Sequence, residues 1–155
     1  MLIVLLLIEI VAASASSKSE EDIFNTFSVV AYDPANGDLG VAVQSKAFAV
    51  GARVPYARAK VGAVTTQATT NPSFGPRGLA LLERGLSPQQ VIDSLLKADE
   101  RPAVRQLAII DARGPVAVHT GDSCIDWKGS KAGPFYSCQG NLLVGRAVVD
   151  SMAAA

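Results

Sequence analysis

The sequence predicts an α+β fold, because strands and helices are segregated along the chain. β-prone runs come first, two adjacent helical segments follow, and strands then return before a final helix. Such segregation favours layered α+β packing over a parallel sheet built from alternating strands and helices. With 155 residues and a hydrophobic fraction of 49%, the chain is large enough to bury the core of one globular domain.

The clearest local signal is a β-hairpin near residue 26. Two β-prone runs, residues 27–32 and 39–45, flank a polar stretch that contains Asn36-Gly37. Asn-Gly between alternating apolar runs is a strong hairpin signal, because both residues tolerate the positive φ of tight turns. The nearly continuous apolar character of the two runs predicts a central hairpin, with the helical pair covering one face of its sheet.

The next elements follow from residue periodicity and punctuation. Residues 48–54 and 60–67 are predicted strands, and residues 78–84 form a helix-prone run that Gly85 is placed to end. Ser87-Pro88-Gln89-Gln90 predicts a second helix start, with Ser as the cap, Pro at the first helical position and Gln completing a capping box. The later predicted elements are strands over residues 106–111, 116–120 and 135–139 and a helix over 144–155.

Charge and motif content argue against several classes of function. The formal net charge is zero and the 14 basic residues are scattered, so no nucleic-acid partner is predicted. The sequence has no Gly-x-Ser-x-Gly elbow, phosphate loop or metal motif, so no cofactor is expected. Two cysteines and one histidine also make a poor zinc-ligand set.

The first fifteen residues are predicted to be a signal peptide. An apolar run over residues 2–8 precedes Ala13-Ser14-Ala15, which fits the small-x-small cleavage pattern of secretory signals. The run is too short to span a bilayer, so the mature protein is expected in the cell envelope or secreted, with no membrane span. Glu9 and the lack of an early basic residue leave a wrong start site or an uncleaved anchor as alternatives. Residues 16–25 form a predicted polar leader.

The two cysteines, Cys124 and Cys138, suit an exported chain because they could pair. The stretch between them is rich in turn residues, which predicts that they lie close enough to bridge. Two independent buried thiols are the alternative.

Several stretches of the chain follow a pattern shared with a known family. They cover residues 26–34, 39–46 and 49–57 at the start and residues 62–68, 71–79 and 139–143 later on. Together these stretches resemble the DUF1028 family. That family is placed among the N-terminal-nucleophile (Ntn) hydrolase-like folds, so the resemblance implies a four-layer αββα sandwich for residues 26–155. Such sandwiches normally continue with further strands and a helix. The sequence ends in Met152-Ala153-Ala154-Ala155 without a helix cap, so the sandwich is expected to be incomplete at its C-terminus.

The resemblance implies that Thr26 is the nucleophile. In this mechanism class the α-amine of the first residue, with a solution pKa of about 8, acts as the base on its own side chain. Signal cleavage after Ala15 would expose Ser16, so a further cut between Asn25 and Thr26 is required. The alternative is that Thr26 is simply a β-branched strand residue.

The register of the hairpin determines which residue faces Thr26. A two-residue loop pairs Thr26 with Ala47, a three-residue loop pairs it with Lys46, and a four-residue loop pairs it with Ser45. Lys46 beside the terminal amine would favour the neutral, basic form of that amine. The sequence leaves the choice between Lys46 and Ser45 open.

Two further residues are candidate donors to an oxyanion, which requires preorganised hydrogen bonds. Gln67 ends the strand before the helical pair, and Asn141 follows Gly140 near the end of a later strand. The candidate catalytic residues are therefore Thr26, Lys46, Ser45, Gln67 and Asn141.

Two functions are compatible with this sequence. The first is an Ntn-type hydrolase of an amide or related acyl bond in a small-molecule or peptide-like substrate. The second is a non-catalytic secreted or envelope binding protein that keeps the fold without freeing Thr26. A homo-oligomer is compatible with either function.

Overall fold

The computed structural model describes residues 25–155. The predicted signal peptide therefore lies outside the described residues, as does the predicted polar leader up to residue 24. Within the described residues, two antiparallel four-stranded sheets have the strand orders β2-β1-β8-β7 and β3-β4-β5-β6. The strands are β1 (Thr26–Tyr32), β2 (Leu39–Ser45), β3 (Pro55–Arg58), β4 (Gly62–Ala68), β5 (Arg105–Asp111), β6 (Val116–Thr120), β7 (Gly129–Gly133) and β8 (Tyr136–Asn141). The helices are α1 (Val50–Arg53), α2 (Phe74–Glu83), α3 (Pro88–Lys97), the 3-10 helix η1 (Pro102–Val104) and α4 (Ala147–Ala154).

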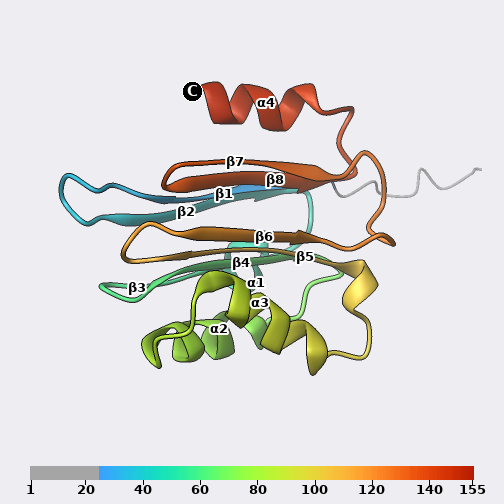
Figure 1. Ribbon diagram of the computed structural model, residues 1–155. Helices are drawn as coiled ribbons and strands as arrows, with labels where there is room; N and C mark the ends of the chain where they lie inside the picture. The colour runs from blue at the N-terminus through green and yellow to red at the C-terminus, as the bar shows by residue number, and fades with distance from the viewer. Residues whose placement is uncertain (1–24) are drawn as a thin grey trace, which may run out of the picture.

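The elements form layers, which confirms the predicted α+β class. The two sheets pack face to face, helix α4 lies over the outer face of the first sheet, and α2 and α3 cover the outer face of the second (Figure 1). Between residues 25 and 155, no helix is long and apolar enough to cross a bilayer.

The hairpin forms with a four-residue loop, which pairs Thr26 with Ser45. Asp33 closes the loop, because its N–H donates to the carbonyl of Asp38 at 2.9 Å and its carbonyl accepts from the N–H of Gly37 at 2.8 Å. Gly37 has φ of 82°, a left-handed conformation that glycine adopts without steric cost. Of the registers that the sequence left open, the structure selects the one with Ser45.

The predicted central position of the hairpin is only partly correct. Strand β1 is an inner strand, and Val30 on it is fully buried, but β2 forms an edge of the first sheet. Residues along β2 alternate between half-buried and exposed, so Val41 and Val43 are covered on one face only. The helical pair packs on the second sheet rather than on the sheet of the hairpin, so this part of the prediction was wrong. The inner side of the second sheet instead packs against one set of hairpin residues, which comprises Val30, Tyr32, Leu39 and Val41.

The second sheet and its helices hold the main apolar core. The side chains of Phe74, Ile92, Leu95 and Leu107, from α2, α3 and β5, are buried there together. Helix α3 begins as predicted, because the capping box of Ser87 and Gln90 is present in both directions. These helices fix the outer face of β4 and β5, whose opposite face lines the space between the sheets.

Two further elements differ from the sequence prediction. The predicted strand over residues 48–54 is wrong, because the short helix α1 occupies most of it after a left-handed residue, Ala49, with φ of 55°. The adjacent strand β3 starts at Pro55, which suits the first position of an edge strand because proline lacks an N–H. Strand β7 carries no apolar alternation and forms as the edge partner of β8.

Candidate functional site

Thr26 lies at the head of β1, between two predicted site residues. Its register partners are Ser45 on β2 and Asn141 on β8. The residue is 8% exposed, and its Oγ1 lies 2.9 Å from Ser45 Oγ, a hydrogen bond in which either hydroxyl can donate. Ser45 Oγ also accepts from the backbone N–H of Ala47 at 3.1 Å. The Ser45 hydroxyl is therefore held in place beside the Thr26 hydroxyl.

A cavity of about 420 Å³ opens beside Thr26. Thr26 and Asn141 come from the first sheet and Gln67 comes from the second, so three of the predicted site residues line one cavity between the sheets. Its lining comprises Thr26, Ala47, Val50, Arg53, Val54, Gln67, Ala68, Thr69, Thr70, Val104, Ser123, Cys124, Ile125, Asn141 and Leu142. The volume suits a small ligand, because ligand pockets usually span some hundreds of cubic ångströms.

Gln106 connects Gln67 and Asn141 behind the cavity. Its Oε1 accepts from Gln67 Nε2 at 2.8 Å and from Asn141 Nδ2 at 3.0 Å. Its Nε2 donates to the carbonyl of Gly140 at 2.8 Å and to Thr120 Oγ1 at 3.0 Å. Gln106 has no exposed surface, and a buried amide with such bonds fixes the orientation of the groups it touches.

Gln67 and Asn141 differ in what they can offer a ligand. Gln67 Oε1 accepts from Ser28 Oγ at 2.5 Å, while Gln67 Nε2 donates to Gln106 and has a longer contact of 3.5 Å to the carbonyl of Gln139. Both ends of the Gln67 amide are thus engaged inside the protein. The Asn141 amide nitrogen has two hydrogens, one of which is bound by Gln106. Asn141 is therefore the better placed donor toward the cavity.

The polar network continues between the sheets beyond Gln67. Gln139 on β8 donates from Nε2 to Ser28 Oγ at 2.7 Å and to Thr65 Oγ1 at 3.2 Å, and its Oε1 accepts from Ser137 Oγ at 2.8 Å. All of these residues are buried. The contacts tie both sheets together through hydrogen bonds directly behind Thr26.

Lys46, the chain neighbour of Ser45, is not among the residues that line the cavity. It follows the last residue of β2, and its side chain is exposed. The register places Ser45 opposite Thr26 instead. Of the two candidates, Ser45 is therefore the residue that the register places beside Thr26.

Sequence reasoning missed two residues of the site, Arg53 at the cavity wall and Gln106 behind the cavity. Arg53 was hidden because its segment was predicted to be a strand, whereas helix α1 brings it to the cavity wall. Gln106 carried a usable signal, since an amide within the otherwise apolar run Gln-Leu-Ala-Ile-Ile indicates a buried polar contact. Across residues 25–155, no group of three or more His, Cys, Asp or Glu side chains could hold a metal ion.

The predicted bridge between Cys124 and Cys138 is absent, because both are free thiols. Cys124 lines the cavity and its thiol donates to the carbonyl of Arg105 at 3.4 Å. Cys138 alternates on β8 with Ser137 and Gln139, which face the inter-sheet network, so its thiol points to the opposite face. Burial raises the pKa of both thiols. The alternative of two independent buried thiols is thus the correct one.

The fold and site define an α+β protein with two antiparallel sheets and a cavity where their strands end. The family of unknown function DUF1028 matches residues 26–155, and the chain belongs to this family. A crystal structure of a protein from Silicibacter pomeroyi, described with the same family model, is similar to this chain with a TM-score of 0.81 and 31% sequence identity. The similarity covers 84% of this chain and 58% of that protein, so this chain spans somewhat more than half of its relative. No curated protein matches the sequence.

Proposed function

We propose that this DUF1028 protein is an Ntn-type hydrolase of an amide or related acyl bond, with Thr26 as the nucleophile. The observation that supports this function best is the juxtaposition of the buried Thr26 hydroxyl with the Asn141 amide at one cavity. A nucleophile and an oxyanion donor are the two groups that acyl transfer requires at one carbonyl. The Ntn-hydrolase-like four-layer αββα assignment of the fold is part of the same proposal.

The proposed reaction needs a free α-amine on Thr26. That amine takes the proton of the Thr26 hydroxyl as Oγ1 attacks the substrate carbonyl, which produces a tetrahedral intermediate. The Asn141 amide donates a hydrogen bond to the oxygen that becomes negative. The amine then gives its proton to the leaving nitrogen, and the C–N bond breaks to leave an ester on Thr26 Oγ1. Water attacks this ester and the α-amine again accepts the proton. The amine then returns that proton to Thr26 Oγ1 as the bond between Oγ1 and the acyl carbon breaks, which releases the acid product and restores the free hydroxyl and amine.

Ser45 has a supporting position in this scheme. Its Oγ accepts from the Ala47 N–H and lies 2.9 Å from Thr26 Oγ1. The bond to Ala47 holds the Ser45 hydroxyl so that its own hydrogen can stabilise the Thr26 oxygen as that atom loses its proton. Ser45→Ala is expected to lower kcat with little change in the free energy of unfolding.

Maturation is the step that would turn the chain into an enzyme. Export with removal of a signal peptide and a second cleavage between Asn25 and Thr26 would expose the required amine. Secretion or an envelope location is part of this proposal. A protein that retains residues ahead of Thr26 would instead act as a binding protein built on the same cavity.

The test is an amidase and esterase screen of a protein whose first residue is Thr26. Thr26→Ala is expected to abolish turnover and Thr26→Ser to retain part of it, because only the serine keeps a hydroxyl. Thr66→Ala is a matched control, since Thr66 is buried on the same strand as Gln67, does not line the cavity and donates to the carbonyl of Asn71. Turnover that survives in Thr26→Ala would overturn the proposal.

A further inference from the structure

We infer that the cavity selects an amide substrate that carries a carboxylate, and that the Arg53 guanidinium binds that carboxylate. The inference rests on the proposed function for the bond that is broken, but the binding itself does not need the reaction. It names a substrate class for the cavity beside Thr26.

Arg53 gives the cavity its charge. Among the residues of 25–155 that line the cavity, it is the only charged one, so the described part of the wall carries a cation and no carboxylate. Within residues 25–155, the exposed Arg53 guanidinium makes no ion pair, like those of Arg77, Arg84 and Arg101, and is thus available to a ligand. The paired arginines are Arg58 with Glu83, Arg105 with Asp99, Arg113 with Asp111 and Arg146 with Asp150.

The backbone around Arg53 is fixed to the second sheet. Val54 is 3% exposed, and its carbonyl accepts from the N–H of Thr66 on β4 at 3.1 Å. The carbonyl of Arg53 accepts from the Tyr56 hydroxyl at 3.3 Å. The guanidinium therefore starts from a rigid support on one sheet, while Thr26 belongs to the other sheet. A substrate in the cavity can contact both at different ends.

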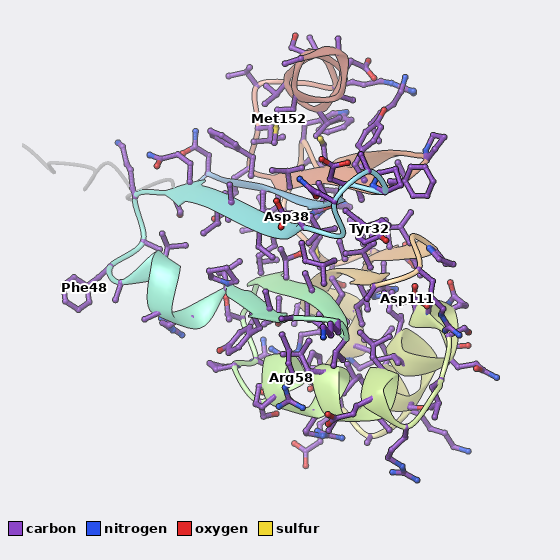
Figure 2. All side chains as sticks on the ribbon, turned by 90° about the vertical axis from the view of Figure 1, so that its left-hand side faces the viewer. Tyr32, Asp38, Phe48, Arg58, Asp111 and Met152 are labelled. Atoms are coloured by element: carbon purple, nitrogen blue, oxygen red, sulfur yellow. The ribbon has the colours of Figure 1, made fainter. Side chains whose placement is uncertain are left out.

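The remaining wall of the cavity is largely apolar. Its aliphatic residues are Ala47, Val50, Val54, Ala68, Val104, Ile125 and Leu142. Ile125 is 62% exposed, which places an apolar side chain at the solvent side of the cavity. Phe48, which follows the lining residue Ala47 in the loop before α1, projects outward from the molecule (Figure 2). Such a wall favours a substrate with an apolar side chain next to its carboxylate.

An amide, a carboxylate and an apolar side chain occur together in N-acylated amino acids and in the last residue of a peptide. A guanidinium binds a carboxylate through two parallel hydrogen bonds, which adds orientation to affinity. With the carboxylate on Arg53, the amide of such a molecule would be directed toward the sheet that carries Thr26. The cavity volume of about 420 Å³ is sufficient for an N-acylated amino acid.

The test measures binding by the full-length chain with Thr26→Ala, so that no ligand is consumed. Calorimetry compares N-acetyl-L-leucine with N-acetyl-L-leucinamide, which differ only at the terminal group, a carboxylate in one and a neutral amide in the other. The carboxylate is expected to bind about two- to fivefold more tightly, because Arg53 is exposed and an exposed ion pair contributes less than the free energy of a tenfold affinity ratio. Arg53→Gln is expected to abolish this preference.

Arg84→Gln is the matched control, because Arg84 is an exposed arginine that follows α2 on the far side of the second sheet. It removes the same charge and is expected to keep the preference for the carboxylate. Equal affinity for the two ligands, or an unchanged preference in Arg53→Gln, would overturn the inference. An N-acetylated tripeptide that ends in leucine, compared with N-acetyl-L-leucine, shows whether the cavity prefers a peptide C-terminus or an N-acylated amino acid. Arg53-dependent binding of either ligand supports the inference.

The outcome is separable from that of the proposed function. Arg53-dependent binding without turnover in any form of the chain would leave a carboxylate-binding cavity and remove the hydrolase. Turnover of amides that is the same with and without a carboxylate would leave the hydrolase and remove the role of Arg53.

Discussion

Gln106→Met should destabilise the protein strongly, because the buried Gln106 amide is the acceptor that two other buried amides share. Methionine has a similar length and fills the space, so the change removes hydrogen bonds without opening a large cavity. Gln67 Nε2 and Asn141 Nδ2 then lose the oxygen that lies 2.8 and 3.0 Å away. Each unsatisfied buried donor costs about 1 to 3 kcal/mol, so the free energy of unfolding should fall by about 2 to 6 kcal/mol.

The assay is urea unfolding followed by circular dichroism, with the slope against urea expected to stay constant. Gln89→Met is the matched control. Gln89 is an exposed residue of α3, and within the described residues its side chain makes one hydrogen bond, to Asp93. A loss below about 1 kcal/mol for Gln106→Met would refute the network as a structural unit, because it is less than the cost of two unsatisfied donors.

Three further predictions concern other parts of the structure. Burial raises the pKa of Asp99, but its hydrogen bonds outweigh this effect and hold the pKa below the usual value. The carboxylate therefore stabilises the protein above the unfolded pKa of about 3.9 and loses this contribution as the pH falls through the lower folded pKa, so the stability gap to Asp99→Asn, measured by urea unfolding, should shrink below about pH 4. Gly75→Ala should cost about 1 to 3 kcal/mol in the same assay, because a Cβ would clash with the ring of Tyr56. Cys138 should react with iodoacetamide only after unfolding, as read by mass spectrometry, because its thiol is buried and free and does not line the cavity.

Each of these has an outcome that would contradict it. A stability gap between wild type and Asp99→Asn that grows below pH 4 would have the wrong sign. Gly40→Ala is the control for the glycine substitution, since a Cβ at Gly40 meets no atom within 4 Å, and equal effects at the two glycines would refute the steric argument. Isolation of the folded protein with a disulfide would contradict the free thiols.

Much of the fold follows from local signals in the sequence. The hairpin at Asn36-Gly37 and the capping box at Ser87 form as expected, because each depends on backbone preferences within a few residues. Helix α1 could not be predicted, because the apolar run over residues 48–54 fits a strand as well as it fits a helix. Strand β7 lacks an apolar pattern, so its pairing with β8 depends on the rest of the sheet.

Part of the candidate site could also be predicted from the sequence, but for a different reason. Thr26, Gln67 and Asn141 each lie at a strand end, and the resemblance to the DUF1028 family marked those positions. Their meeting at one cavity depends on how the two sheets pack, which no local pattern encodes. The same limit applies to Arg53, which reaches the cavity wall because α1 packs beside β2 and the next residue, Val54, is hydrogen-bonded to Thr66 of β4.

The central claim is that the α-amine of Thr26 acts as the base for its own hydroxyl. The most direct measurement compares two proteins that differ by one residue, one beginning at Thr26 and one beginning at Asn25, on the same amide substrates. The account predicts turnover only in the protein that begins at Thr26, with a rate that rises with pH as the amine loses its proton near its pKa of about 8. Equal turnover in the protein that retains Asn25 would contradict the account, because its Thr26 nitrogen is an amide with no basic lone pair.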